Sequence, residues 1–330
     1  MGTVTRIRDV LKIEPRGAVA EIAARLRQTV ADGLRRRGAV VAMSGGVDSS
    51  VCAGLAVQAL GPQRVFGLLL PEAESGAEDL ALGREWADRL GIAYRIEEIS
   101  GILAACGAYE RRDEAIRTVV PEFGPGWSSK ITVDADRHAR EGLTVFYLIV
   151  RSPEGELRKH RLPPVAYREI VAATNFKQRV RKMLEYHHAD RLHYAVIGTP
   201  NRLEYDQGFF VKGGDGLADV KPIAHLYKTQ VYQLARELGV PEGVTARPPT
   251  TGTYSLPQTQ EEFYWGAPVE IMDIVLYGCN HQIPPEEVAE EVGMPAEAVA
   301  HMYRDVGLRR STTRYLHLTS MLLEPVAEIS

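Results

Sequence analysis

The sequence predicts an α/β fold, in which a doubly wound parallel sheet carries helices on both of its faces. Apolar runs of strand length alternate with amphipathic segments of helix length between residues 17 and 96, and again from about residue 167. The apolar runs are continuous, which is typical of strands that are buried on both faces. A glycine-rich turn at residues 44–50 joins the first run to a helix, which is the local order of an α/β unit.

The elements of this body follow from hydrophobic spacing. Apolar side chains from Val19 to Leu34 recur at helical spacing over residues 17–37, and an apolar run follows at residues 39–43. A helix resumes after the glycine-rich turn and continues to Leu60. In chain order, the other predicted elements are a strand at 64–70, a helix at 78–90, a strand at 93–96, a helix at 167–188, a strand at 194–197 and a helix at 227–238.

Residues from about 106 to 165 interrupt this alternation and predict an insertion. A β-prone run at 143–150 is followed by Pro153 and Gly155 and then by the alternating residues 156–162. This order predicts a β-hairpin that extends from the α/β body.

The chain from about residue 258 to 330 has helical spacing, with breaks at 278–285 and 293–295. We therefore expect a single domain over residues 1–330, with an inserted hairpin and a helical C-terminal part. Within this part, residues 286–306 have the spacing of a helix-turn-helix, but the first helix is rich in glutamate. Contact with nucleic-acid phosphates is therefore unfavourable there.

Composition excludes several classes of protein. Hydrophobic residues make up 45% of the chain and the net charge is −4, so nothing predicts a general attraction to nucleic acid or to an anionic membrane. No apolar run approaches the length of a membrane span, and the N-terminus lacks the apolar core of a signal peptide. Cys52, Cys106 and Cys279 are scattered without a CxxC pair, which favours a reducing cytoplasm over disulfides or structural zinc. Residues 134–138 contain carboxylates and a histidine, but without metal-site spacing.

The strongest chemical signal is the sequence SGGVDS at residues 44–49. Its glycines let backbone N–H groups approach an anion, and the following helix N-terminus adds positive potential. No Gly-Lys-Ser/Thr ends the loop, so it is not a Walker A motif. A plain turn with Asp48 as a helix cap is the structural alternative, and the strand–loop–helix order favours an anion-binding loop. Asp48 then suits Mg²⁺, which proteins usually hold with one or two carboxylates beside phosphate oxygens.

This loop resembles the PP-loop of the ATP pyrophosphatases, and motifs in the second half of the chain narrow the resemblance to the ammonia-dependent NAD synthetase family. Residues 175–181 resemble the family's Asn-x-x-x-Arg-x-Arg helix, and residues 198–204 resemble its Gly-Thr-x-x-x-x-Glu. Residues 208–215 resemble its Gly-Phe/Tyr-x-Thr-Lys-Tyr-Gly-Asp. Further matches continue in register at 219–223, 226–230 and 249–250, and the resemblance covers about residues 17–100 and 167–310.

The resemblance implies a role for each matching residue. The residues expected to bind ATP are Ala42, Met43, Ser44, Gly45, Gly46, Val47, Asp48, Ser49, Thr199, Lys228 and Thr250. Asp48 and Glu204 would share Mg²⁺. The acceptor, a dinucleotide that carries a carboxylate, would bind Arg179, Lys212 and Asp219. The residues expected to act in catalysis are Asp48, Lys212, Asp215 and Lys228.

The implied reaction is ATP-dependent amide formation. ATP with Mg²⁺ would adenylate the carboxylate of nicotinic acid adenine dinucleotide and release pyrophosphate. Ammonia, either free or supplied by a separate glutaminase, would then displace AMP and give NAD. The family forms homodimers with the dinucleotide at the subunit interface, so the resemblance also implies a homodimer.

The sequence departs from the family pattern on the acceptor side. The family's Tyr after the motif lysine is Gly213 here, its Thr before that lysine is Val211, and its basic C-terminal motif is not recognisable at residues 311–315. A related amide ligase that acts on a different carboxylate therefore remains an alternative. A non-catalytic nucleotide-binding partner of a glutaminase is disfavoured because Asp48 and Lys228 are retained. A tRNA sulfur-transfer enzyme is disfavoured because paired cysteines and a basic surface are lacking.

Several motif residues have structural alternatives when each is taken alone. Arg179 and Arg181 would also fit a solvated helix face, and Lys228 would fit the surface of a helix's first turn. Phe209 and Phe210 are expected to have a packing role rather than to form a platform for a ligand, although one of the rings would also suit stacking on a base or a pyridine. Only the joint spacing of the motifs favours the functional roles.

Overall fold

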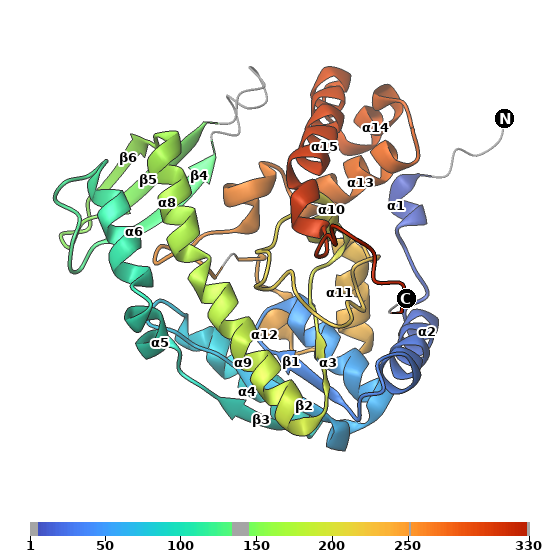
Figure 1. The fold of residues 1–330 in the computed structure, drawn as a ribbon. Helices are drawn as coiled ribbons and strands as arrows, with labels where there is room; N and C mark the ends of the chain where they lie inside the picture. The colour runs from blue at the N-terminus through green and yellow to red at the C-terminus, as the bar shows by residue number, and fades with distance from the viewer. Residues whose placement is uncertain (1–5, 134–144, 251, 329–330) are drawn as a thin grey trace.

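The computed structural model describes residues 6–133, 145–250 and 252–328, and its centre is a parallel sheet (Figure 1). The strand order is β3-β2-β1-β7, and every neighbouring pair is parallel. The strands are β1 (Ala39–Ala42), β2 (Val65–Leu69), β3 (Ala93–Ile96) and β7 (Ala195–Ile197). All of them lie within the runs that the sequence predicts to be strands. Since β2 and β7 lie on opposite sides of β1, the order reverses at β1, and ligands of such sheets bind at this crevice.

The side chains of β1 alternate between two apolar cores, which confirms the doubly wound arrangement. Val41 packs into a core with helices α2 (Pro15–Gln28), α3 (Val47–Leu60), α4 (Ala77–Leu90) and α11 (Lys228–Glu237). Val40 packs into the opposite core with α5 (Ser100–Ala105) and α9 (Phe176–Leu192). The two layers of helices cover the sheet on its two faces (Figure 1).

Two predicted helices are each divided in the structure. The α2 helix continues as a π-helical turn, η1 (Thr29–Gly33), so the region is helical only to residue 33. The helix predicted at 167–188 is two helices, α8 (Pro164–Thr174) and α9, which meet at Asn175. Asparagine has a low helix propensity, which is consistent with a break at this position.

The insertion contains a three-stranded antiparallel sheet, with the order β4-β5-β6. The strands are β4 (Ser128–Val133), β5 (Phe146–Arg151) and β6 (Leu157–Arg161). The β5–β6 pair is the predicted hairpin, whereas β4 was not predicted because a segment rich in Pro and Gly precedes it. The start of the predicted β-prone run, at residues 143–144, lies outside the described residues, as does the candidate segment 134–138. Helices α6 (Ala108–Arg117) and α8 complete a separate apolar core with this sheet.

The free edge of β4 holds a loop from the C-terminal half of the chain. The Ser129 N–H donates to Ser255 Oγ at 2.8 Å, and the Ser129 carbonyl accepts from the Leu256 N–H at 3.2 Å. Lys130 forms an ion pair with Glu262 at 3.1 Å. The insertion therefore acts as a support for residues 252–263, a part that is distant in sequence.

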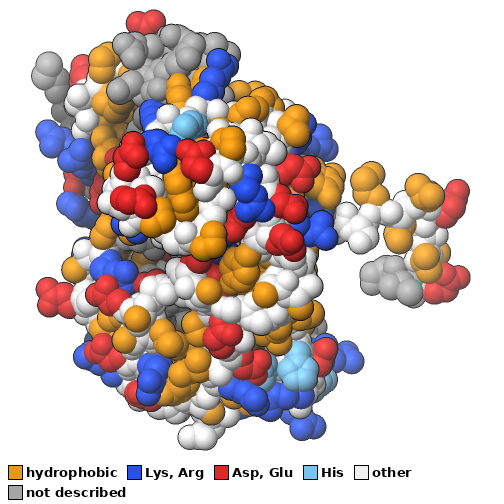
Figure 2. Space-filling model, turned by 90° about the vertical axis from the view of Figure 1, so that its left-hand side faces the viewer, with side chains coloured by type: hydrophobic (Ala, Val, Ile, Leu, Met, Phe, Trp, Pro, Cys, Tyr) orange, Lys and Arg blue, Asp and Glu red, His pale blue; other side chains and the backbone are white. Residues whose placement is uncertain are grey.

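The helical C-terminal part packs against the body around a core of its own. Its main helices are α13 (Val269–Asn280), α14 (Pro285–Val292) and α15 (Ala296–His317), as predicted from the breaks in helical spacing. The remaining short elements are α1 (Ile7–Val10), η2 (Pro62–Arg64), α10 (Arg202–Gln207), α12 (Glu242–Thr245) and η3 (Glu261–Trp265). Among the described helices, none combines the length and the apolar character needed to cross a bilayer. On the face shown in Figure 2, side chains of both charges are interspersed.

A buried ion network connects the insertion to the end of β2. The Nζ atom of Lys177, on α9, lies 2.9 Å from Glu72 Oε1 and 2.6 Å from Glu74 Oε2, and the Lys177 side chain is only 3% exposed. Arg112, on α6, also binds Glu74 at 2.5 Å. Burial alone would raise the pKa of Glu72, but Lys177 lowers it below the usual value.

We predict that Lys177→Met destabilises the fold, because it leaves the buried carboxylate of Glu72 without its cation and Glu74 with Arg112 alone. The expected loss in the free energy of unfolding is about 3–5 kcal/mol, measured by urea denaturation. The control is Arg89→Met, which removes an exposed ion pair with Glu85 and should cost at most about 1 kcal/mol. Equal losses in the two variants would contradict a structural role for the network.

Candidate active site

The SGGVDS loop leaves the carboxyl end of β1 at the point where the strand order reverses. Its shape is fixed by its own serines, because Ser49 Oγ accepts from the Ser44 N–H at 3.2 Å and donates to the Gly46 carbonyl at 3.0 Å. Gly45 has φ = +78°, in the left-handed region, and Gly46 caps the N-terminus of α3. The loop and the helix N-terminus together form an arrangement suited to phosphate groups.

Asp48 and Lys228 meet at the mouth of this loop. Asp48 lies in the first turn of α3, and Lys228 is the first residue of α11, with a side chain that is 2% exposed. The Lys228 Nζ atom donates to Asp48 Oδ2, and Asn201 Nδ2 donates to Asp48 Oδ1 at 3.1 Å. Lys228 is therefore buried, and the alternative of a surface lysine was wrong.

Glu204 is the second carboxylate of this group. It lies in the first turn of α10, where it forms a capping box with Asn201, and its Oε1 atom accepts from Gln260 Nε2 at 2.9 Å. Burial and the neighbouring charge of Asp48 raise the pKa of Glu204 to about 7, although Lys228 acts in the opposite direction. A buried carboxylate beside a second carboxylate is a suitable ligand for a divalent cation, whose charge would favour the ionised form of Glu204.

Lys228 stays charged in this environment. Burial alone would lower its pKa, but Asp48 and Glu204 raise it above the usual value. The backbone of Lys228 is fixed by Asp273, on α13, whose carboxylate accepts from the Lys228 N–H at 3.2 Å and the Thr229 N–H at 2.7 Å. Burial raises the pKa of Asp273 to about 6. No signal in the sequence identifies Asp273, because its partners are more than forty residues away.

The loop that carries Thr250 is joined to Glu204 through Gln260. Thr250 forms a β-bridge with Thr259, and the Gln260 N–H donates to the Pro249 carbonyl at 2.9 Å. The side chain of Gln260 then reaches Glu204, as described above. Gln260 was missed by the sequence analysis, since it belongs to none of the matched motifs.

The residues expected at the acceptor lie on α9 and on the loop that follows α10. Arg179 is exposed, and its Nε atom donates to the Lys212 carbonyl at 3.3 Å. Asp215 accepts from the Val211 N–H at 2.7 Å, and burial raises its pKa. Asp219 accepts from the Val196 N–H at 2.7 Å, so it ties this loop to β7.

Arg181 differs from its neighbour on α9. It is half-buried, and its Nε atom donates to the Leu70 carbonyl at 3.2 Å. The solvated helix face proposed as an alternative therefore fits Arg179 but not Arg181. The structure also pairs Lys182 with Glu185 at 2.7 Å inside the protein, a buried pair that the sequence analysis missed.

Lys212 and Lys228 have different partners. The Nζ atom of Lys212 donates to the carbonyl oxygens of Tyr315 and Leu318, both at 2.8 Å, at the end of α15. The same atom lies 4.1 Å from the centroid of the Tyr315 ring. Lys212 is thus held by the C-terminal segment, whereas Lys228 is held by the carboxylates at the PP-loop.

Phe209 has the packing role that was predicted for it. Its ring centroid lies 4.7 Å from that of Tyr264 and 5.4 Å from that of Trp265. Phe210 contacts different rings, with its centroid 5.1 Å from that of His317 and 6.1 Å from that of Tyr205.

Sequence comparison identifies relatives over nearly the whole chain. The NAD synthase family matches residues 18–122 and 149–312, so the whole of β4 lies in a part that the family pattern does not include. A protein of Rhizobium rhizogenes named NH(3)-dependent NAD(+) synthetase is 52% identical over 318 residues, with 96% of each chain covered. A protein of the same name from Thermotoga maritima is 39% identical over 215 residues, which are 65% of this chain and 70% of that protein.

Solved structures support the fold. The NH3-dependent NAD synthetase of Campylobacter jejuni superimposes with a TM-score of 0.62 at 19% identity, covering 95% of this chain and 100% of that one. The NMN synthetase of Francisella tularensis superimposes with a TM-score of 0.64 at 21% identity, covering 94% and 99%.

We predict that Gly45→Ala abolishes phosphate binding at the loop. A Cβ atom at Gly45 would overlap the backbone of Asp79, and φ is positive there, so the loop must move. The expected result is a loss of ATP affinity of at least about tenfold, which corresponds to about 1.4 kcal/mol, measured by titration calorimetry.

Gly61→Ala is the matched control for this loop variant. Gly61 has φ = +81° at the other end of α3, but a Cβ atom there meets nothing within 4 Å. Gly61→Ala should cost about 1–3 kcal/mol of stability, because φ = +81° with ψ = 152° is a conformation that essentially only glycine adopts, and it should leave ATP affinity unchanged. ATP affinity that is unchanged in Gly45→Ala would show that the loop does not hold the phosphates.

Proposed function

The chain belongs to the NAD synthase family, and we infer that it catalyses the ATP-dependent amidation of nicotinic acid adenine dinucleotide with ammonia. The products are NAD, AMP and pyrophosphate. The observation that carries this inference is the meeting of Asp48, Glu204 and Lys228 at the SGGVDS loop, a site for a nucleotide's phosphates. The names of relatives that are 52% identical supply the nitrogen donor and the product.

The PP-loop half of the site is proposed to bind ATP. Backbone N–H groups of residues 44–46 and the N-terminus of α3 would face the phosphates that leave as pyrophosphate. Lys228 would neutralise the charge that develops on them, since its ammonium group is already fixed and desolvated. Thr199 and Thr250 are proposed to contact the rest of the nucleotide, because Thr199 follows β7 and Thr250 lies in the loop that Gln260 joins to Glu204.

Asp48 and Glu204 are proposed to hold Mg²⁺. Their hard oxygen atoms suit this ion, and a bound cation would offset the burial and the charge of Asp48 that raise the pKa of Glu204. When bound, Mg²⁺ supplies charge neutralisation at the triphosphate.

The reaction proceeds in two steps. A carboxylate oxygen of the acceptor attacks the α-phosphorus of ATP, and the bond to the leaving pyrophosphate breaks. Ammonia then attacks the acyl carbon of the adenylate. The bond between this carbon and the bridging oxygen breaks, so AMP leaves with that oxygen, and the attacking nitrogen releases one proton. Adenylation provides the leaving group, so the protein's contribution is positioning and charge neutralisation.

The acceptor half is proposed to include Arg179, Lys212, Asp215 and Asp219. Asp219 would act mainly by fixing the loop that carries Lys212, because its own oxygen atoms are bonded to Val196 and Tyr186. An acceptor carboxylate or phosphate would replace the carbonyl oxygens of Tyr315 and Leu318 as partners of Lys212. A homodimer and a cytoplasmic location remain predictions from the resemblance and the composition.

The direct test is product formation with defined acceptors. With ATP, Mg²⁺, ammonium and nicotinic acid adenine dinucleotide, the protein should form equal amounts of NAD, AMP and pyrophosphate. Asp48→Asn should lower turnover by at least about a hundredfold without loss of fold, whereas the exposed Asp9→Asn should match the wild type. Turnover of nicotinic acid mononucleotide, with none of the dinucleotide, would overturn the acceptor assignment and retain an amide ligase. Wild-type turnover by Asp48→Asn would overturn the site.

The metal site is expected to depend on pH. Since Mg²⁺ binds the ionised carboxylate, its affinity should fall as the pH falls through the Glu204 pKa of about 7. We expect the affinity for Mg²⁺, measured by calorimetry without nucleotide, to be about tenfold weaker at pH 6 than at pH 8. Glu204→Gln should bind Mg²⁺ weakly at both values. An equal pH dependence in the variant would mean that a different group titrates.

A further inference from the structure

The loop at residues 252–263 is held by strand β4 of the insertion. Gln258 is buried, and its Nε2 atom donates to the carbonyl oxygen of Ile131 on β4. The Lys130 Nζ atom, also on β4, donates to the Pro257 carbonyl at 3.2 Å. Because β4 lies in a part of the chain that the NAD synthase family pattern does not include, this pattern does not specify these contacts.

Gln260 connects the same loop to Glu204, the proposed Mg²⁺ ligand. Its side chain is almost buried, and its Nε2 atom donates to Glu204 Oε1 at 2.9 Å. The Gln260 Oε1 atom accepts from the indole N–H of Trp265 at 3.5 Å. An indole N–H is only a donor and an ionised carboxylate is only an acceptor, so the amide of Gln260 has a single favourable orientation between them.

Both oxygen atoms of the Glu204 carboxylate have a hydrogen-bond donor. The Asn201 N–H donates to Oε2 at 3.1 Å within the capping box of α10, and Gln260 donates to Oε1. The first donor is local, whereas Gln260 is 56 residues away in the chain. Since each carboxylate oxygen accepts more than one bond, the two donors fix the plane of the group and leave lone pairs for a cation.

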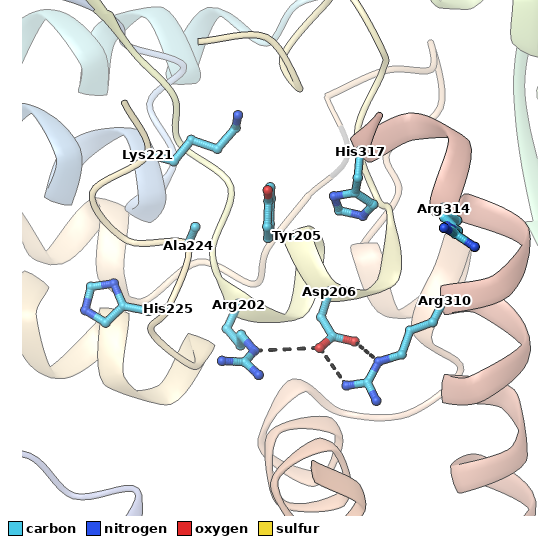
Figure 3. Close-up of a pocket in the computed structure, with 9 residues that line it drawn as sticks. All are labelled: Arg202, Tyr205, Asp206, Lys221, Ala224, His225, Arg310, Arg314 and His317. Carbon is cyan, nitrogen blue, oxygen red and sulfur yellow. Dashed lines mark hydrogen bonds and ion pairs between the residues drawn. The ribbon is translucent and has the colours of Figure 1, made fainter. Parts of the chain in front are cut away.

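The backbone of α10 is held separately from the Glu204 side chain. Asp206, on the same helix, binds Arg310 of α15 at 2.6 and 2.7 Å, and Arg202 approaches it at 3.7 Å (Figure 3). These residues border a cationic cavity between α10, residues 221–225 and α15, and the cations in its lining are Arg202, Lys221, Arg310 and Arg314. Loss of the bond from Gln260 would therefore leave α10 in place and free only the side chain of Glu204.

We propose that Gln260 is a positioning residue for the metal ligand Glu204, and that strand β4 of the insertion keeps Gln260 in place. Gln260 donates a hydrogen bond without adding charge, so it orients the carboxylate and does not compete with a cation for it. Residues that orient a metal ligand in this way typically contribute about tenfold to a hundredfold in metal affinity. This inference rests on the proposed Mg²⁺ site and adds the residues that orient it.

The test measures metal affinity without nucleotide. Mn²⁺, which shares the preference of Mg²⁺ for oxygen ligands, is titrated while the electron paramagnetic resonance signal of the free ion is recorded. Gln260→Met keeps the length of the side chain but removes the donor, and it should weaken Mn²⁺ binding by at least about tenfold. NAD formation by this variant should be low at limiting Mg²⁺ and recover at saturating Mg²⁺, because Glu204 is still present.

Gln233→Met is the matched control for this variant. The amide of Gln233 donates to the Leu11 carbonyl at 3.1 Å and accepts from the Ile13 N–H at 3.0 Å. The substitution therefore removes two hydrogen bonds of a glutamine that holds the N-terminal segment, and it should retain the wild-type affinity for Mn²⁺.

The role of the insertion is tested with Gln258→Met, which removes the bond to β4 and leaves every residue of the proposed metal site unchanged. This variant should also bind Mn²⁺ more weakly than the wild type. If Gln258 acts through Gln260, the double variant of both residues should bind Mn²⁺ as strongly as Gln260→Met alone, since the two effects are not independent. Additive losses would overturn the role assigned to β4.

Glu204→Gln separates failure of this inference from failure of the proposed metal site. Weak Mn²⁺ binding by Glu204→Gln, with wild-type binding by Gln260→Met, would overturn the role of Gln260 and leave the metal site intact. Wild-type binding by both variants would overturn the metal site, and the role of Gln260 with it. A loss of NAD formation in Gln260→Met that saturating Mg²⁺ does not restore would indicate a general structural role instead of positioning.

Discussion

The buried ion pair between Lys228 and Asp48 is the interaction on which the rest of the site depends. It joins the N-terminus of α3 to the N-terminus of α11, two helices that are 180 residues apart in the chain. A desolvated ammonium group requires fixed acceptors, since the cost of burying an unpaired charge is large. The neighbouring residues meet this requirement: Asn201 orients Asp48, Glu204 adds a second negative charge, and Asp273 holds the backbone of Lys228.

The same group of charges is connected to the insertion through Gln260. Glu204 accepts a hydrogen bond from Gln260, the segment around Gln260 lies on the edge of β4, and Arg112 of the insertion is paired with Glu74 beyond the end of β2. The insertion thus holds the segment around Gln260, which borders the proposed ATP site. It does so at a strand edge, through a backbone hydrogen bond from Leu256, a hydrogen bond to the Ser255 hydroxyl and the ion pair of Lys130 with Glu262.

Much of the fold was predictable because its signals are local. Continuous apolar runs identified the strands of the parallel sheet, and the turn at residues 44–50 identified the start of α3. Predictions failed where the signal was weak: β4 follows a segment rich in Pro and Gly, and a single helix was expected across Asn175. Phe209 was correctly assigned to packing, since its ring lies against those of Tyr264 and Trp265 beside the C-terminal core.

The sequence by itself determined the fold class, and it predicted a phosphate-binding loop and one site that contains Asp48, Glu204 and Lys228. These depend on hydrophobic spacing and on the order of motifs, which the chain carries without being folded. Only the tertiary structure decided that Lys228 is buried, that Lys212 is held by the end of α15, and that Asp273 and Gln260 support the site. It also assembled the cationic cavity from α10, residues 221–225 and α15. Such contacts join residues that are distant in sequence, and burial, which sets their charges and pKa values, exists only in the packed protein.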